Sequence, residues 1–296
     1  MVEGKPTTGS TVPRRQLGRY LRDLRNRSRL TVRAAADRLE WSEAKIWRIE
    51  TGQTSLRSLD VETMCRIYGA PADLTAALMG LAKETKARGW WHSYGDVIPE
   101  TFDVYIGLEE AASRLSWYES ELVPGLLQTE DYARTLMRAG NTGVDDAEIE
   151  RRVRVRIARQ DLLTRVTQPP TLEVVLNEAI LRRPIGSAAI MARQLDRLAE
   201  ASELPNVSIR VIPFTAGLHH GIMAGSFVIL RFPVGNDGRE AEPPTVYSDG
   251  FTGDLYLDKP HEVERYHTAF QSIWDTALDE QDSKDLVSKV AKELEK

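Results

Sequence analysis

Residues 17–53 read LGRYLRDLRNRSRLTVRAAADRLEWSEAKIWRIETGQ, and this stretch predicts three short helices joined by tight connections. In the first helix, apolar side chains recur at i, i+3, i+4 and i+7, which is the spacing of one helix face. Those side chains are Leu17, Tyr20, Leu21 and Leu24. Thr31 and Ser42 precede the second and third helices, where a side-chain oxygen can accept a hydrogen bond from a free backbone N–H. Two helices joined by a tight turn, here at Glu40-Trp41, are typical of a helix-turn-helix.

Two more helices are predicted after this stretch, up to about residue 88. The second of them begins near Pro71, which suits the first turn of a helix because the missing proline N–H has no partner there in any case. We therefore expect an all-α, five-helix helix-turn-helix domain over residues 14–88. Residues 1–13 are mostly polar and are expected to form a disordered tail.

Charge is unevenly distributed along the chain. Residues 1–90 contain 17 Lys and Arg against 10 Asp and Glu, a net charge of +7. The whole chain carries −5, so the remaining residues carry −12. A basic N-terminal part joined to an acidic remainder is expected when only the N-terminal part binds a polyanion such as double-stranded DNA.

The opening stretch also resembles the phage-repressor-like (XRE-type) family of helix-turn-helix domains, over about residues 16–70. The matching features are Leu30-Thr31 before the second helix, Ser42 before the third, and the ending Glu50-Thr51-Gly52. The resemblance implies DNA binding. It also implies an ion pair between Arg25 and Glu50, with the structural role of tying the first helix to the third.

Two positions depart from the pattern of that family. Glu40 stands at a turn position that is usually glycine, because a left-handed backbone conformation is often needed there. Val32 stands where the family favours a glutamine that often touches DNA, so that contact is either missing or apolar.

The third helix is expected to be the recognition helix, whose N-terminal residues face the bases. Arg48 could donate two hydrogen bonds to guanine, and Glu43 could accept one from cytosine. Ser42 and Lys45 are expected to hold phosphates. Two interpretations of Trp47 stay open: it packs against its neighbours, or it contacts a thymine methyl group or a sugar. The expected DNA-contacting residues are Arg15, Thr31, Arg33, Ser42, Glu43, Lys45, Trp47 and Arg48.

After residue 89 the pattern changes to mixed helices and strands. Helices are predicted over residues 101–121, 146–166, 187–202, 261–278 and 284–295. Strands are predicted over residues 171–176, 206–212, 226–232, 245–247 and 255–257. We expect residues 89–296 to form an α+β regulatory or partner-binding domain, with a mixed or antiparallel sheet and flanking helices. The arginine-rich run at 151–159 is expected to be a solvated helix face rather than a phosphate site.

Several strings in this second part resemble a large actinobacterial regulator family with a C-terminal domain of uncharacterised function (DUF5753-like). They are residues 122–133 (LVPGLLQTEDYA), 177–181 (NEAIL) and 211–217 (VIPFTAG), followed by His219 and Gly221. The resemblance covers about residues 95–290. It implies a regulator of development or secondary metabolism, and a very small protein partner encoded nearby.

The loop of residues 213–225 is the expected binding site of the second domain. It is rich in glycine and holds two histidines, and ordering such a loop costs conformational entropy that stability alone does not require. We expect Phe214, His219, His220 and Phe227 to border a pocket or groove for an effector or a protein partner. A mobile loop with Phe214 and Phe227 in the core is the alternative.

The sequence lacks the common catalytic and metal-binding motifs. There is no HExxH, CxxC, Gly-x-Ser-x-Gly or phosphate-loop pattern, so we expect no catalysis, no metal and no cofactor. The single cysteine, Cys65, cannot form a disulfide within the chain. No run reaches the ~18–20 apolar residues of a membrane span, and the first residues do not look like a secretory signal. A cytoplasmic location without membrane contact is expected.

Together these patterns predict a sequence-specific DNA-binding transcriptional regulator whose second domain binds an effector or a small protein partner. One helix-turn-helix reads only a few base pairs, so we expect a homodimer, with its dimer surface in residues 95–296. The alternative is an antitoxin-like interaction module that neutralises a small partner and binds DNA only for autoregulation.

Overall fold

The computed structural model of the chain divides into Met1–Ala111, which we name the helical unit, and Ala112–Lys296, which we name the α+β unit. It describes residues 11–86, 90–94, 98, 100–141, 143–234, 240, 242–250 and 253–294. Among the helices in these ranges, none is both long enough and apolar enough to cross a membrane.

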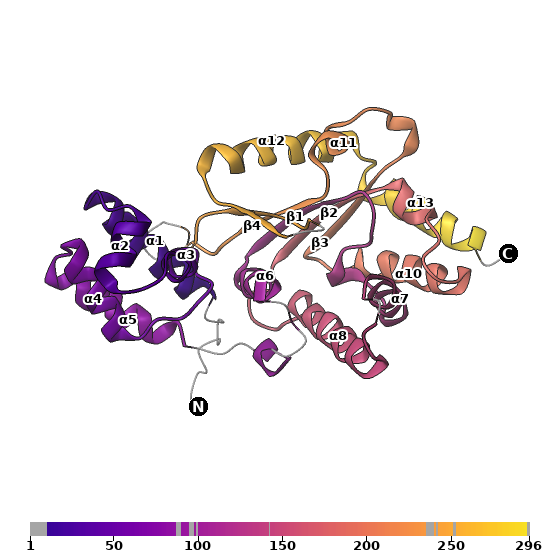
Figure 1. Ribbon diagram of the computed structural model, residues 1–296. Helices are drawn as coiled ribbons and strands as arrows, with labels where there is room; N and C mark the ends of the chain where they lie inside the picture. The colour runs from indigo at the N-terminus through magenta and orange to yellow at the C-terminus, as the bar shows by residue number, and fades with distance from the viewer. Residues whose placement is uncertain are drawn as a thin grey trace. The chain divides into compact units, whose positions relative to one another are not determined.

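The helical unit contains the five helices that the sequence predicts (Figure 1). They are α1 (Thr11–Arg27), α2 (Val32–Leu39), α3 (Glu43–Glu50), α4 (Ser58–Tyr68) and α5 (Ala72–Glu84). Their apolar faces meet in one core, which includes Leu17, Leu21 and Leu24 of the predicted stripe, whereas Tyr20 is exposed. The expectation of an all-α helix-turn-helix domain is confirmed.

The turn between α2 and α3 is left-handed, although a glutamate occupies it. Glu40 has φ 56° and ψ 38°, the conformation that glycine would adopt more easily. The helices on either side are capped as predicted. Thr31 Oγ1 accepts a hydrogen bond from the N–H of Ala34 at 3.1 Å, and Ser42 Oγ accepts one from the N–H of Lys45 at 3.2 Å.

A buried ion pair joins α1 to the end of α3, as the family resemblance implies. Arg25 Nε donates to Glu50 Oε1 at 2.6 Å, and Arg25 Nη2 donates to Glu50 Oε2 at 2.7 Å. The two helices approach closely at Gly18, where a Cβ atom would collide with the carbonyl oxygen of Ile49. The paired hydrogen bonds of a guanidinium and a carboxylate fix this crossing geometrically.

A sixth helix, α6 (Glu100–Ala111), also belongs to the helical unit and is tied to α1. Arg14 Nη2 donates to Asp103 Oδ2 at 3.1 Å, and Trp91 Nε1 donates to Asp103 Oδ1 at 2.7 Å. The two compact units divide after Ala111, whereas the sequence places the domain boundary at residues 88–89, which stays a prediction.

The start of α1 shortens the expected tail. Residues 11–13 are helical, and Thr11 is buried against Gly107 of α6 so closely that a Cβ atom there would not fit. The prediction of disorder is therefore wrong for residues 11–13, and for residues 1–10 it lies outside the described residues.

The α+β unit is built on a mixed sheet, which confirms the expected fold class. Its described strands are β1 (Arg114–Glu119), β2 (Thr171–Asn177), β3 (Val207–Ile212), β4 (Phe227–Arg231), β5 (Thr245–Ser248) and β6 (Leu255–Leu257). They lie in the order β3-β2-β1-β4-β5-β6. Strands β1, β2 and β3 are parallel, whereas β4 is antiparallel to β1 and β5 and β6 continue the antiparallel half.

The predicted helix over residues 101–121 is wrong in its second half. Helix α6 ends at Ala111, and residues 114–119 form β1, which lies between β2 and β4 in the middle of the sheet. Four consecutive residues of β1 are buried because helices cover both faces of the sheet. A strand that is buried on both faces loses the alternation of apolar and polar residues, so its apolar positions also matched helical spacing.

Helices lie on both sides of the sheet (Figure 1). On one side are α11 (His220–Ala224) and α12 (Pro260–Thr276), and Val263, Phe270 and Ile273 of α12 pack into a core with the strands. The helices of the other side are α7 (Glu130–Gly140), α8 (Asp146–Ala158) and α10 (Ala188–Ala201). Helix α13 (Glu280–Leu294) packs against α10 and β3, and the single turn α9 (Glu178–Arg182) follows β2.

Candidate DNA-binding and partner-binding surfaces

The outward face of α3 presents most of the side chains expected to contact DNA. Glu43 and Arg48 are exposed, and Trp47 is 55% exposed. This exposure leaves both interpretations of Trp47 open, packing against its neighbours and contact with a thymine methyl group or a sugar. Contact between Trp47 and DNA stays a prediction.

Lys45 is held against an aromatic ring beside this face. Its ammonium nitrogen lies 3.3 Å from the centroid of the Trp41 ring, within the range of a cation–π interaction. Trp41 is half-buried and packs against the core. The charge of Lys45 is therefore placed near the start of α3 before any phosphate arrives.

The start of α2 provides a second exposed element. Arg33 is exposed, and Thr31 is exposed while its hydroxyl caps the helix. Val32 is half-buried and packs against the core of the helical unit. Its side chain is therefore occupied within the protein, which fits the absence of the glutamine found in the related family.

Arg15 does not belong to the DNA-contacting surface, so its assignment to that set is wrong. It is only 6% exposed. Gly52 lies directly over it, because a Cβ atom on Gly52 would come within 2.6 Å of Arg15 Cγ. The helical spacing that placed Arg15 on a charged face did not reveal that the end of α3 covers this position.

Family motifs in the α+β unit mostly hold loops together. Gln128 Nε2 donates to the carbonyl oxygen of Val123 at 2.6 Å, and Arg156 Nη1 donates to Gln128 Oε1 at 2.7 Å. Gln160 Nε2 donates to the carbonyl oxygens of Gly125 and Gln128 at 3.3 and 2.6 Å. One arginine of the arginine-rich helix α8 is thus hydrogen-bonded to the 122–133 motif.

Glu178, from the 177–181 motif, anchors the loop that follows β3. Its carboxylate accepts hydrogen bonds from the backbone N–H of Phe214 and from Arg182 Nε, both at 2.8 Å. Burial alone would raise the pKa of Glu178, but these two hydrogen bonds together with the positive charges of Arg182 and Lys289 outweigh it, so the pKa is lowered. An ionised Glu178 therefore supports the loop structurally.

His219 caps the N-terminal end of the short helix α11. His219 Nδ1 accepts a hydrogen bond from the N–H of Gly221 at 3.1 Å, and the imidazole meets the Tyr118 ring edge-on at 6.1 Å. Gly221 lies so close to the Tyr118 ring that a larger residue would not fit. Burial lowers the pKa of His219, so the neutral imidazole is favoured.

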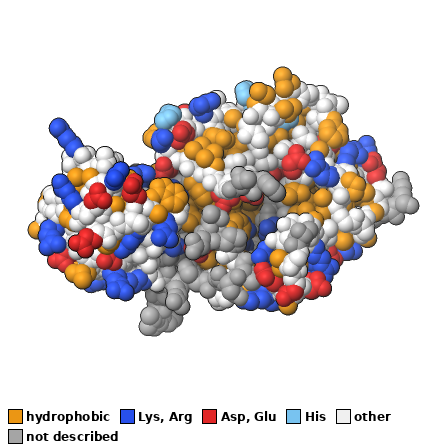
Figure 2. Space-filling view, in the orientation of Figure 1, with side chains coloured by type: hydrophobic (Ala, Val, Ile, Leu, Met, Phe, Trp, Pro, Cys, Tyr) orange, Lys and Arg blue, Asp and Glu red, His pale blue; other side chains and the backbone are white. Residues whose placement is uncertain are grey.

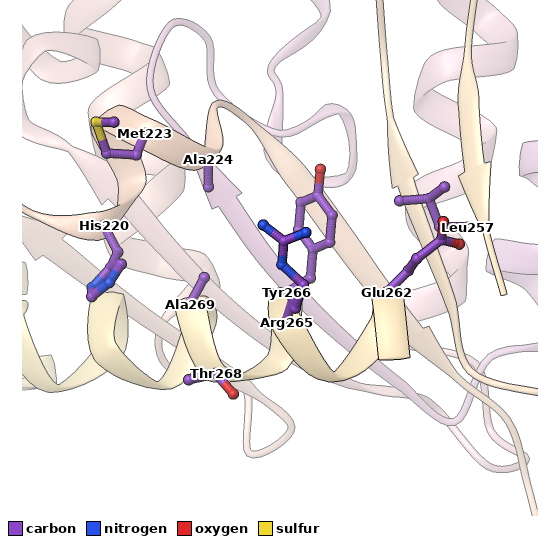
Figure 3. Close-up of a pocket in the computed structure, with 9 residues that line it drawn as sticks. All are labelled: His220, Met223, Ala224, Leu257, Glu262, Arg265, Tyr266, Thr268 and Ala269. Carbon is purple, nitrogen blue, oxygen red and sulfur yellow. The ribbon is translucent and has the colours of Figure 1, made fainter. Parts of the chain in front are cut away.

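A cavity of about 620 Å³ lies between α11 and α12 (Figure 3). It is lined by His220, Met223, Ala224, Leu257, Glu262, Arg265, Tyr266, Thr268 and Ala269. His220 Nδ1 forms a hydrogen bond with Ser272 Oγ at 2.7 Å, which ties α11 to α12. Of the four residues expected at a pocket, His220 is the one that lines this cavity.

The other three expected residues have different positions. Phe227 is buried in the core, where its ring lies 4.9 Å from that of Tyr266, so its assignment to a pocket is wrong and the core alternative is right. His219 is the buried cap described above. Phe214 is exposed and lies outside the lining of this cavity, so its placement in the core is wrong, and its contact with a partner stays a prediction.

The lining residues that the sequence reasoning missed come mainly from α12. Glu262, Arg265, Tyr266 and Ala269 follow the spacing i, i+3, i+4 and i+7 of one helix face. That periodicity was available in the sequence, but nothing in it showed that α11 would stand opposite this face.

Residues 214–223, which we name the apolar segment, expose four large hydrophobic side chains. Phe214, Leu218, Ile222 and Met223 are between 58% and 82% exposed. Figure 2 shows hydrophobic side chains gathered on the surface over α11. Gly217 and Gly225 lie on either side of residues 218–224. Their φ angles of 66° and 69° are backbone conformations that other residues rarely adopt.

Carboxylates also gather where β1 and β5 end. Burial raises the pKa of Glu119 to about 7, although hydrogen bonds from Ser226 and Trp117 oppose the shift. Burial and the neighbouring Asp254 raise the pKa of Asp249. In the part of the chain that the structure describes, no three His, Cys, Asp or Glu residues are placed to hold a metal ion.

Comparisons with known proteins identify both parts of the chain. Residues 16–78 match the family model described as a helix-turn-helix domain. Residues 102–289 match the model described as a domain of unknown function, DUF5753. Searches of curated proteins and of solved structures gave no match. The helix-turn-helix match agrees with the geometry of α2 and α3. Because the DUF5753 model covers more than half of the sequence, the chain belongs to the DUF5753 family and carries an N-terminal helix-turn-helix domain.

Proposed function

We propose that this protein is a sequence-specific transcriptional regulator that reads DNA with α3 and binds a small protein partner through the α+β unit. The reading of DNA is supported by helix α3, which is capped at its start, joined to α1 at its end and exposed on its outer face. Ser42 caps it, Glu50 is locked to Arg25, and Arg48 is left exposed on its outer face. Such a helix can enter a major groove without rearrangement.

The observation that supports partner binding is the apolar segment. Exposed clusters of large apolar side chains on a soluble surface are typical of protein-interaction sites. Leu218 and Met223 are each more than 80% exposed. Packing within the described chain does not explain this exposure of two large apolar side chains. Met223 also lines the cavity between α11 and α12, so a partner that covers the segment can place a side chain into that cavity.

A protein partner fits this surface better than a small effector does. The cavity is open to solvent and has charged side chains, Glu262 and Arg265, on its α12 wall. Most of the apolar segment lies outside the cavity lining, where a small molecule would leave it uncovered. A protein covers both surfaces together, as interfaces with an apolar centre and a polar rim do.

We propose that the protein acts in the cytoplasm, binds two DNA half-sites as a homodimer and performs no catalytic step. One recognition helix contacts too few bases for useful specificity, whereas two helices one DNA turn apart read a longer site. Growth inhibition by the partner alone, relieved by this protein, would favour the antitoxin-like alternative over regulation of other genes.

The test is a charge substitution in the apolar segment with a matched control. Met223→Asp and Leu218→Asp should abolish partner capture by the tagged full-length chain and leave its DNA affinity unchanged. Val166→Asp is the control, because Val166 is fully exposed in the loop before β2. Equal capture by all three variants would contradict the proposed surface, and loss with all three would show that added charge alone disrupts capture.

A further inference from the structure

Helix α6 packs with one part of the chain and belongs by sequence to the other. It packs against α1, which places it in the helical unit. The DUF5753 match, however, begins at residue 102, within α6. A helix of the second family domain is therefore docked on the unit that carries α3.

Two contacts hold α6 against the start of α1. Arg14 Nη2 donates to Asp103 Oδ2 at 3.1 Å and to Thr11 Oγ1 at 3.3 Å, while Asp103 Oδ1 accepts from Trp91 Nε1 at 2.7 Å. One turn further along α6, a Cβ atom on Gly107 would come within 1.8 Å of Thr11 Oγ1. We name Thr11, Arg14, Asp103 and Gly107 the α1–α6 clamp. Because Thr11 and Arg14 are buried, salt screens this clamp less than it would a surface ion pair.

Helix α1 also supports the end of the recognition helix. The ion pair of Arg25 with Glu50 and the close approach of Gly18 to the carbonyl oxygen of Ile49 both join α1 to α3. Close-packed interiors transmit displacements because they leave little free space. A shift of α1 imposed by α6 must therefore change the support of α3.

At its other end, α6 leads directly into the sheet of the α+β unit. Two residues, Ala112 and Ser113, separate α6 from β1, and β1 lies between β2 and β4. Ser113 is already bonded to both neighbouring strands. Its N–H donates to the carbonyl oxygen of Arg231 at 2.8 Å, and its carbonyl oxygen accepts from the N–H of Thr171 at 2.9 Å. No long linker is therefore present to absorb a change in β1 before it reaches α6.

We propose that the α1–α6 clamp couples the two units, so that a partner bound to the α+β unit alters the affinity of α3 for DNA. This inference rests on the proposed DNA binding and adds its regulation. Coupling between two sites is reciprocal, since each site must affect the other by the same factor. If the sheet supports the clamp and the clamp supports α3, DNA bound to α3 must in return resist the opening of β1. DNA is therefore a probe of the coupling that does not require the partner.

The test is amide hydrogen exchange, read by mass spectrometry, in the full-length chain with and without a DNA duplex that it selects. The bound duplex should slow exchange in β1 of the parent at least about fivefold. Asp103→Asn should abolish this slowing while the duplex still slows exchange in α3, because an asparagine places an NH2 group against the Arg14 or the Trp91 donor. A merely structural role of Asp103 would change exchange in the free chain, but not its response to DNA.

The control is Ser58→Ala, which removes a hydrogen bond of 3.2 Å to the carbonyl oxygen of Met79 and leaves α1 and α6 unaltered. It should keep the response of β1 to DNA, and loss of the response here would show that any destabilisation of the helical unit has this effect. Should Asp103→Asn fail to fold, Thr11→Val decides. It keeps the shape of the side chain facing Gly107, removes the oxygen that accepts from Arg14, and should lessen the response.

DNA binding is measured first, by fluorescence anisotropy with a labelled duplex, so that two failures can be told apart. A parent that binds no duplex would overturn the proposed function and this inference with it. A parent that binds DNA without slower exchange in β1 would overturn the coupling alone. An unchanged response of β1 in the clamp variant would show that the coupling does not pass through the α1–α6 clamp.

Discussion

Arg25 and Glu50 form two hydrogen bonds of 2.6 and 2.7 Å that join α1 to the last residue of the recognition helix. Both side chains are buried, so each charge depends on the other for its solvation. Through this pair, the position of α3 is set by the core of the helical unit and not by DNA.

Removing one partner of this pair should be strongly destabilising. We expect Arg25→Met to lower the free energy of unfolding of the helical unit by about 3–5 kcal/mol, because it leaves the Glu50 carboxylate buried and uncompensated. The double variant Arg25→Met with Glu50→Leu should recover part of that loss. Urea unfolding of the two variants and the parent measures this, and a double variant no more stable than Arg25→Met would contradict the expectation.

The left-handed turn at Glu40 predicts a substitution that stabilises the protein instead of destabilising it. Glu40→Gly should stabilise the protein by about 0.5–1 kcal/mol, because glycine adopts φ 56° without the steric cost that a Cβ atom brings. Arg38→Gly, two residues earlier and inside α2, is the control and should destabilise by about 1 kcal/mol. Thermal unfolding midpoints should therefore shift in opposite directions, and a shift of both in the same direction would show that Glu40 is not strained.

Glu119 predicts a dependence of stability on pH. Its pKa is about 7 in the folded chain and 4.5 for an ordinary glutamate, so the folded state binds the proton more tightly. This contribution to stability is fully present below about pH 4.5 and is lost as the pH rises through 7. Relative to the parent, Glu119→Gln should become more stable across that interval. Unfolding measured at several pH values checks this, and a constant difference between parent and variant would contradict it.

Much of the helical unit was predictable because its signals are local. Caps at Thr31 and Ser42, the apolar stripe of α1 and the Arg25–Glu50 pair each depend on residue types at fixed spacing or on a family pattern. Strand β1 was not predictable in this way, since its burial depends on helices that lie far away in sequence. The joining of α6 to α1 through Asp103 and Arg14 is likewise a long-range contact.

The candidate sites show the same limit. Exposure of Arg48 follows from its position on α3, but the burial of Arg15 depends on Gly52, which lies 37 positions later in the sequence. In the α+β unit, partner binding by the 213–225 loop stays a prediction, and the structure places most of the four residues expected to border the site elsewhere. His219 acts as a cap and Phe227 lies in the core, and only the fold shows that α12 supplies most of the cavity wall.

The most direct test of the central claim is a selection of preferred sites from random DNA duplexes with the full-length parent and with Arg48→Ala. We expect the parent to select a defined site with two half-sites. Arg48→Ala should lose about 1–3 kcal/mol on that site and relax the preference at one position of each half-site, while other positions stay selected. A parent that selects no sequence, or an Arg48→Ala variant that selects the same sequence with the same affinity, would contradict the claim that α3 reads DNA in this protein.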